Sequence, residues 1–405
     1  MKPFEAQLVR NAVPMPRTSR LLLSLFSRLR YGSLRFTTPE GVTFSFQGDL
    51  PGPAACLDVL SWQACGEIVR RGDVGFAEGY IDRLWETDDL VNLITLAALN
   101  RDAVEKAIYG RWWGRVLYRL RHFLRTNTRT GSRRNIAAHY DLGNDFYRLW
   151  LDETMTYSAG LFEAEPLRPL AAAQTAKYER VLDRLDVQPG DRILEIGCGW
   201  GGFAAHAAAS RGCTVHGITL SVEQLRWARA HANRAGLADR VSFEFLDYRD
   251  TVGRYDHVVS LEMYEAVGER YWPAYFGTVR DRLKPGGKAL VQAITIDDEL
   301  FDRYRRGTDF IQQYVFPGGM LASPQVLRGE IERAGLRVRN AFGFGTDYAE
   351  TLRRWRIRFN KAIPEVHALG FDERFVRLWN FYLAYCEAGF RARSTDVFQV
   401  EIERV

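Results

Sequence analysis

The C-terminal two thirds of the chain alternates between short apolar runs and segments of helical period. Runs of β-branched and other apolar residues predict seven strands, at residues 192–196, 213–218, 241–246, 257–260, 288–293, 336–341 and 398–403. Strands that alternate with helices form a mostly parallel, doubly wound sheet. We therefore expect an α/β domain over residues 135–405.

Two long insertions interrupt this pattern, at residues 297–321 and 348–395, because the last predicted strand lies far downstream. Both are dense in aromatic side chains, among them Phe301, Tyr304, Phe310, Tyr314 and Phe316 in the first insertion, and Trp355, Phe359, Trp379, Phe381, Tyr382, Tyr385 and Phe390 in the second. Such aromatic-rich insertions form either the walls of an apolar binding site or an ordinary core.

A different pattern marks residues 1–105. Alternating residues at 33–38 and 42–46, separated by Pro-Glu-Gly, predict a β-hairpin, and Pro51-Gly52-Pro53 then breaks the chain. A strand and helix at 56–69 and an apolar helix at 88–99 complete a small α+β domain. It contains no titratable cluster that suggests chemistry, so we expect a substrate- or lipid-binding domain.

The composition is that of a globular protein, with 46% hydrophobic and 26% charged residues, but its net charge of +5 is unevenly placed. Residues 106–134 hold nine Lys or Arg and no acid, and Arg111, Arg115 and Arg119 recur every four residues beside an apolar stripe. A basic amphipathic linker helix of this kind favours an anionic membrane surface. A packed linker is the alternative, and contact with nucleic acid is not expected.

The apolar run near the N-terminus and the cysteines indicate where the protein is located and whether it binds a metal. The apolar run at 21–26 is too short to span a membrane. Five cysteines without a C-x-x-C pair indicate reduced thiols, as in a cytoplasmic protein. If the basic helix binds a membrane, we expect the protein on the inner face of that membrane. No Cys/His set has ligand spacing, so no metal is expected. A homodimer and a monomer both remain open.

The predicted strand 192–196 runs into a glycine turn with Gly197, Gly199 and Gly202, and a helix of small residues follows. Strand, glycine turn and helix bring backbone N–H groups close to a ligand. The spacing also satisfies the dinucleotide fingerprint, which alone is a weak indication. Two cofactor classes therefore fit this turn, a dinucleotide and S-adenosylmethionine.

Acidic residues decide between these two cofactors. A dinucleotide site places an acid at the end of the second strand to hold the ribose, and residues 216–221 contain none. Glu195, before the glycines, and Asp247, after the third strand, instead favour S-adenosylmethionine. In that arrangement the glycines admit the methionine part, and Asp247 faces the adenine.

At this point the chain resembles the cyclopropane-fatty-acyl-phospholipid synthase family, which includes the mycolic acid methyltransferases. The matching stretches are residues 138–147, 152–158, the turn at 197, 217–224, 247–250, 262–268, 316–319, 385–390 and 396–400. The resemblance implies a seven-stranded, Rossmann-like class I methyltransferase sheet. It implies donor binding by Tyr157, Ser158, Glu195, Gly197, Gly199, Thr219, Leu220, Gln224, Asp247 and Tyr248.

The resemblance also implies the chemistry. The π electrons of an acyl-chain double bond attack the methyl group of S-adenosylmethionine, and an apolar, aromatic-lined tunnel shields the resulting carbocation until it loses a proton. Ring closure on an unsaturated phospholipid acyl chain, which gives a cyclopropane fatty acid, is the first expectation. A methyl- or methylene-branched chain from the same cation is the alternative. A small-molecule methyltransferase and a catalytically inactive lipid-binding protein are the other interpretations.

In this family a bicarbonate held by a Cys, a Glu, a His, a backbone group and a Tyr accepts the proton. Glu265, the backbone of Ile294 and Tyr348 match three of these positions. The Cys position corresponds to Ala159 and the His position to Gln292. A glutamine can still hydrogen-bond an anion, but an alanine side chain cannot.

Glu262 is a further departure, because many members of the family have Gly at this position. Together these changes put the use of bicarbonate in doubt. The hypothesis from sequence is that Glu265, with Tyr348 and Glu262, either holds the anion or supplies the base.

Overall fold

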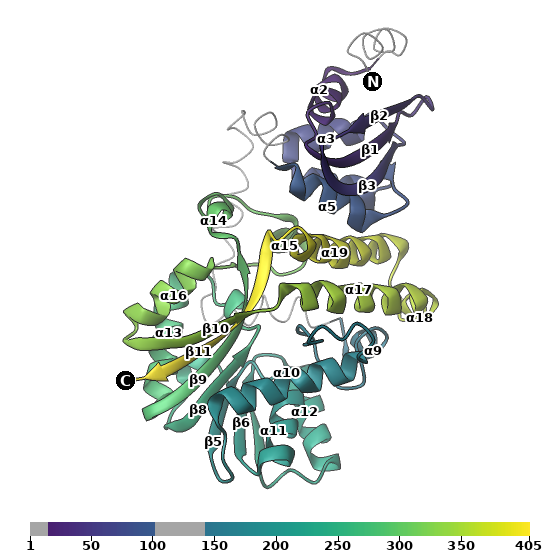
Figure 1. Cartoon of the computed structure of the whole chain (residues 1–405). Helices are drawn as coiled ribbons and strands as arrows, with labels where there is room; N and C mark the ends of the chain where they lie inside the picture. The colour runs from purple at the N-terminus through teal and green to yellow at the C-terminus, as the bar shows by residue number, and fades with distance from the viewer. Residues whose placement is uncertain (1–14, 102–141) are drawn as a thin grey trace. The chain divides into compact units, whose positions relative to one another are not determined.

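The computed structural model describes residues 15–101 and 142–405, which form two compact units (Figure 1). One unit combines residues 15–101 with Ile363–Ala392, and the other combines residues 142–362 with Arg393–Val405. The basic helix predicted at 106–134 lies outside the described residues. No helix in the described part of the chain is long and apolar enough to cross a membrane.

The larger unit is built on a seven-stranded sheet of order β10-β11-β9-β8-β5-β6-β7. Its strands are β5 (Arg192–Ile196), β6 (Thr214–Thr219), β7 (Val241–Phe245), β8 (Tyr255–Leu261), β9 (Leu283–Ile296), β10 (Leu336–Gly343) and β11 (Thr395–Arg404). Strands β5 to β9 pair in parallel, whereas β11 lies antiparallel between β9 and β10. All seven predicted strands are present, and the doubly wound sheet is confirmed.

Helices cover both faces of this sheet (Figure 1). Successive strand residues point to opposite faces, and here both sets are apolar, so each face needs a layer of helices to bury it. Ile193 packs in the core with α10 (Leu170–Leu185), α11 (Gly202–Arg211) and α12 (Val222–Arg234). Its neighbour Leu194 packs in a second core with α13 (Trp272–Arg282) and α16 (Pro324–Arg333). The remaining helices of the unit are α9 (Asn144–Arg148), η1 (Tyr248–Asp250), η2 (Tyr264–Ala266), η3 (Glu269–Tyr271), α14 (Asp298–Tyr304), α15 (Phe310–Tyr314) and α17 (Gly345–Lys361).

The smaller unit contains a sheet of order β2-β1-β3-β4, and its predicted hairpin is confirmed as β1 (Tyr31–Thr37) and β2 (Thr43–Gln47). The break expected at Pro51-Gly52-Pro53 is wrong, because β3 (Leu50–Val59) runs through it, parallel to β1. Strand β4 (Trp85–Glu86) pairs only with the last two residues of β3. The prolines therefore lie on an open edge, where a missing N–H is tolerated.

The helices of the smaller unit are α2 (Arg17–Phe26), α3 (Gln63–Arg71), α4 (Asp73–Ile81), α5 (Leu90–Leu99), α18 (Ile363–Ala368) and α19 (Glu373–Arg391). Helix α19 packs against α4 and α5, and the ring of Phe381 lies 6.0 Å from that of Phe76. The sequence predicts one continuous domain over 135–405, whereas the structure places Ile363–Ala392 with the N-terminal residues. The second aromatic insertion is therefore divided between the two units.

Candidate active site

The glycine turn after β5 requires glycine for both conformation and space. Gly197, Gly199 and Gly201 have φ values of +85°, +53° and +84°, in the left-handed region. The N–H groups of Gly197 and Cys198 donate to the carbonyl of Ile218 at 3.0 and 2.9 Å, which fixes the turn to β6. A Cβ atom on Gly197 would lie 2.8 Å from the Met263 side chain.

The turn lies where the strand order reverses, with β6 on one side of β5 and β8 on the other. Open α/β sheets bind ligands at this switch point, beyond the carboxyl ends of the strands. Glu195 stands there on β5 with 2% exposure, and its Oε2 has no hydrogen-bond partner among the described residues. Burial raises the pKa of Glu195 to about 8, against the opposing attraction of Lys177. Such an acid fits a cationic or hydrogen-bond-donating group of a ligand.

At the end of β6, Thr219 donates its hydroxyl to Oε1 of Gln224 at 3.0 Å. Both side chains are buried, and Leu220 between them is half-buried. Ser221 caps α12 by accepting from the backbone N–H of Gln224 at 3.2 Å. The structure therefore brings together Thr219 and Gln224, two of the residues that the resemblance assigns to donor binding.

Asp247 and Tyr248 follow β7, at the position expected for the adenine. Asp247 accepts from the backbone N–H, Nε and Nη2 of Arg249, at 3.0, 2.8 and 2.6 Å. Arg249 therefore neutralises this buried carboxylate, which also caps η1. The ring of Tyr248 packs against Tyr275 with centroids 5.5 Å apart.

Tyr157 lies within a cluster of aromatic side chains of the larger unit. Its ring centroid is 5.6 Å from Tyr147, 5.3 Å from Trp150 and 5.4 Å from Trp355. Trp150 and Trp355 are fully buried. The aromatic cluster of Tyr147, Trp150, Tyr157 and Trp355 gives the site an apolar wall of ring faces.

Ser158 is held by a buried lysine that the sequence analysis missed. Lys177 of α10 is 0% exposed and donates from Nζ to the Ser158 hydroxyl and, at 2.6 Å, to Oε1 of Gln174. Gln174 donates in turn to the carbonyl of Ser158 at 2.8 Å. Burial lowers the pKa of Lys177 to about 8, although the charges of Glu262, Asp152 and Glu195 oppose the change.

A sequence signal for Lys177 does exist. Gln174 and Lys177 share the buried stripe of α10 with Ala173, Tyr178 and Val181, at helical spacing. A lysine and an amide on an apolar stripe are costly unless they are paired, so they point to a buried polar site.

The carboxylate of Glu262, just after β8, accepts three hydrogen bonds from distant parts of the chain. Its Oε1 accepts from the backbone N–H of Ala159 at 2.8 Å and from Nε2 of Gln292 at 2.7 Å. Its Oε2 accepts from the Tyr348 hydroxyl at 2.6 Å. Burial raises the pKa of Glu262, whereas Lys177 and the three donors oppose this rise.

Gln399, which the sequence analysis also missed, orients Gln292. It lies opposite Gln292 across the β9–β11 ladder and donates from Nε2 to Oε1 of Gln292 at 3.0 Å. Because the Gln292 oxygen is occupied in this way, its NH₂ group faces Glu262. Gln399 alternates with the apolar residues Phe398, Val400 and Ile402 of β11 (Thr395–Arg404), so no pattern in the sequence indicates that its side chain is buried.

Glu265, in η2, is the second carboxylate of the group. Its Oε1 accepts from the backbone N–H of Ile294 at 2.5 Å, and its Oε2 is buried without a partner among the described residues. Burial, and then repulsion from Glu262, raise the pKa of Glu265 to about 8. The structure therefore places Glu262 and Glu265, each with the partners matched from sequence, at the carboxyl edge of the sheet.

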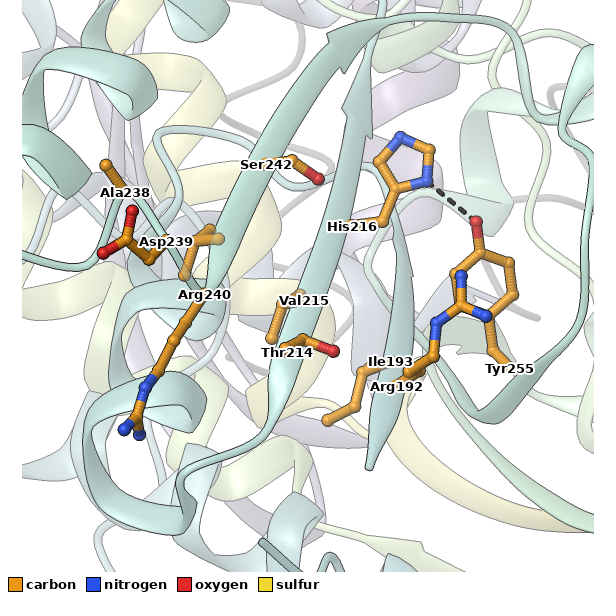
Figure 2. A pocket seen from close by; sticks show the side chains of 11 residues that line it. Arg192, Ile193, Thr214, Val215, His216, Ala238, Asp239, Arg240, Ser242 and Tyr255 are labelled. Carbon is orange, nitrogen blue, oxygen red and sulfur yellow. Dashed lines mark hydrogen bonds between the residues drawn. The ribbon is translucent and has the colours of Figure 1, made fainter. Parts of the chain in front are cut away.

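A separate pocket lies at the opposite edge of the same sheet (Figure 2). It has a volume of about 190 Å³ and is lined by the first residues of β5, β6, β7 and β8, which are Arg192, Thr214, Val241 and Tyr255. His216 there hydrogen-bonds the Tyr255 hydroxyl through Nδ1 at 2.8 Å. None of the predicted site residues lines this pocket.

The strand order, the glycine turn and the acids at the switch point define a class I S-adenosylmethionine-dependent methyltransferase. The chain belongs to the family described as mycolic acid cyclopropane synthetase, which matches residues 127–400. The predicted family and the predicted cofactor are thereby confirmed.

Two relatives span most of the chain. The chain is 43% identical to the tuberculostearic acid methyltransferase UfaA1 of Mycobacterium tuberculosis, over 82% of its own length and 79% of that protein. It is 33% identical to the cyclopropane-fatty-acyl-phospholipid synthase of Escherichia coli, over 83% and 85% of the two chains.

Two solved structures are similar to about two thirds of the chain. The cyclopropane synthase MmaA2 of Mycobacterium tuberculosis is 28% identical, with a TM-score of 0.63 over 67% of this chain and 98% of that one. The mycolic acid cyclopropane synthase CmaA1, in complex with SAH and CTAB, is 29% identical, with the same TM-score and coverage.

Proposed function

We propose that the protein transfers the methyl group of S-adenosylmethionine to the double bond of an unsaturated fatty-acyl chain of a phospholipid. The observation that carries the proposal is the pair of half-buried carboxylates with raised pKa values, Glu262 and Glu265, at the same sheet edge as the glycine turn. Methyl transfer to a heteroatom needs no such pair beside an aromatic wall. Transfer to an alkene does need a base there, because the cation formed must lose a proton, and a carboxylate with a raised pKa can accept it.

One group of residues binds the methyl donor, and another shields the acyl chain and accepts its proton. The bound donor supplies an electrophilic methyl group on a sulfonium. Gly197, Thr219 and Gln224 surround its place at the carboxyl ends of β5 and β6. Tyr157, Trp150 and Trp355 exclude water, and their ring faces tolerate positive charge on the acyl chain. Glu265 offers an unpartnered carboxylate oxygen for the proton.

A methyl- or methylene-branched acyl chain is the proposed product. The sequence motifs alone favour ring closure, but the 43% identity to a tuberculostearic acid methyltransferase supports branching more strongly than the 33% identity to a cyclopropane synthase supports a ring. A cyclopropane fatty acid is the second candidate, supported by the similar cyclopropane synthase structures. Both products lose their proton from the transferred methyl group.

We also propose that the smaller unit contributes to lipid binding and that the basic stretch at 106–134 favours an anionic membrane surface. Nine basic residues without an acid support the second part of this proposal. Charge reversal of Arg111, Arg115 and Arg119 is then expected to weaken binding to vesicles that contain anionic lipid. Unchanged vesicle binding would remove the membrane role of this stretch.

The decisive experiment incubates the protein with isotope-labelled S-adenosylmethionine and vesicles of unsaturated phospholipid, followed by mass spectrometry of the acyl chains. A gain of one CH₂ with a retained double bond identifies the methylene product, and the same gain with loss of the double bond identifies cyclopropane. A saturated methyl branch requires an added reductant. No transfer despite tight binding of S-adenosylhomocysteine would instead support an inactive lipid-binding protein.

A further inference from the structure

The donors found at three positions matched to the family's bicarbonate site are already occupied by a side chain of the protein. Three of the five matched positions are Ala159, Gln292 and Tyr348, and all three donate to the carboxylate of Glu262, at 2.6 to 2.8 Å. A carboxylate has the planar O–C–O geometry and the single charge of bicarbonate. A second anion on the same donors would be repelled and left without hydrogen bonds. These residues therefore do not fit a bound bicarbonate.

The backbone at Glu262 indicates that this arrangement is specific. Glu262 has a φ of +56°, a left-handed conformation that a glycine adopts without strain and a side chain rarely does. Its N–H donates to the carbonyl of Gln292 at 2.8 Å, so the strained residue is fixed beside the same strand that supplies one of its donors. The chain tolerates an unfavourable backbone at the one position that delivers this carboxylate.

We infer that the carboxylate of Glu262 is a built-in replacement for bicarbonate, and that Glu265 is the residue that accepts the proton. This inference rests on the proposed function. Oε1 of Glu265 is fixed by the N–H of Ile294, while Oε2 accepts no hydrogen bond from the described residues. Glu262 has two donors on Oε1 and one on Oε2, so it is the less available base of the two.

The proton transfer balances without any further anion. A C–H bond of the transferred methyl group breaks, and its proton goes to the ionised Oε2 of Glu265. The electron pair of that bond forms either the third bond of the ring or, after a hydride shift to the neighbouring carbon, the methylene double bond. Glu262 keeps its negative charge throughout, which stabilises the nearby cation and strengthens Glu265 as a base.

The first test is direct binding of ¹³C-bicarbonate, measured by NMR line broadening. The wild-type protein is expected to bind none, whereas Glu262→Gly frees three donors, relieves the backbone strain and is expected to bind it. Glu163→Gly is the matched control, because Glu163 is an exposed glutamate with a similar φ of +53° and lies outside the site. Bicarbonate binding by the wild type, or its absence in a Glu262→Gly variant that still binds S-adenosylhomocysteine, would overturn the inference.

The second test measures turnover in bicarbonate-depleted buffer. Wild type and Glu163→Gly are expected to be indifferent to added bicarbonate. Glu262→Gly is expected to lose about 100-fold or more, and to recover at least tenfold with bicarbonate or formate. Dependence of the wild type on bicarbonate would overturn the inference while leaving the proposed function intact. A wild type that transfers no methyl group would overturn the proposed function. The binding test would still show whether the Glu262 carboxylate occupies the position of bicarbonate.

Discussion

The two sides of the active site are built in different ways. The donor side consists of the glycine turn and the ends of β5, β6 and β7, where side chains pair over short sequence distances, Thr219 with Gln224 and Asp247 with Arg249. The acceptor side gathers its groups from Ala159, Gln292 and Tyr348, which are 103, 30 and 86 residues from Glu262. A site of the first kind depends on backbone conformation, whereas a site of the second kind depends on the packing of the whole unit. Mutations on the donor side should therefore lower donor affinity, whereas mutations on the acceptor side should lower turnover and leave donor affinity unchanged.

Glu265→Gln is expected to produce the largest effect and to leave the donor side intact. The amide cannot take the proton, so turnover should fall about 1000-fold, in the middle of the range for general-base residues. Binding of S-adenosylhomocysteine, measured by calorimetry, should stay within about twofold of wild type. Unchanged turnover in single-turnover assays with labelled donor would remove Glu265 from the mechanism.

The pH dependence of the rate at saturating donor reports on the acceptor side alone. Glu265 must be ionised to accept a proton, and its pKa is raised to about 8, so the rate at saturating donor should rise about tenfold per pH unit below 8 and then level off. In Glu262→Gln the repulsion that raises the pKa of Glu265 is gone, so the inflection should move to lower pH.

Glu195 also has a pKa raised to about 8, so donor affinity must be measured at each pH to separate its titration from that of Glu265. A rate that does not change between pH 6 and 8 would contradict the assignment of Glu265. An inflection that Glu262→Gln leaves in place would contradict the coupling between the two carboxylates.

Gly197→Ala should affect the donor side first. Its φ of +85° disfavours a Cβ atom, which would also lie 2.8 Å from Met263, and distortion costing about 1–3 kcal/mol corresponds to a loss of roughly fivefold to 150-fold in donor affinity. Gly190→Ala is the control, since Gly190 has a φ of +89° but no atom lies within 4 Å of the place that its Cβ would take. Equal losses of S-adenosylhomocysteine affinity in both variants would show that backbone strain alone, and not the turn, is responsible.

The same contrast explains what could be predicted from sequence. The seven strands and the glycine turn follow from local patterns, because a strand end and the turn after it are encoded in adjacent residues, whereas Thr219 and Gln224 were assigned by the resemblance. Gln399 was missed because its partner Gln292 lies 107 residues away in sequence. Lys177 was missed although Gln174, three residues away on the same buried stripe of α10, was an available signal. The resemblance aligned Gln292 and Tyr348 with ligands of an anion, but only the structure brings both to Glu262. The position of α19 was missed for a similar reason, because an amphipathic helix does not specify which surface it covers.

Gln399→Leu is expected to give the smallest effect and tests whether the acceptor side extends to a residue that touches no reactant. Loss of its hydrogen bond to Oε1 of Gln292 removes about 1 kcal/mol, which corresponds to roughly fivefold in turnover, with donor affinity unchanged. Gln399→Glu should be worse than Gln399→Leu, because a carboxylate would attract the Gln292 NH₂ group and turn the amide oxygen toward Glu262. If both variants lose turnover and donor affinity together, Gln399 supports the sheet as a whole. If turnover alone falls, and falls further in Gln399→Glu, the orientation of the Gln292 amide affects the rate of proton transfer through its hydrogen bond to Glu262.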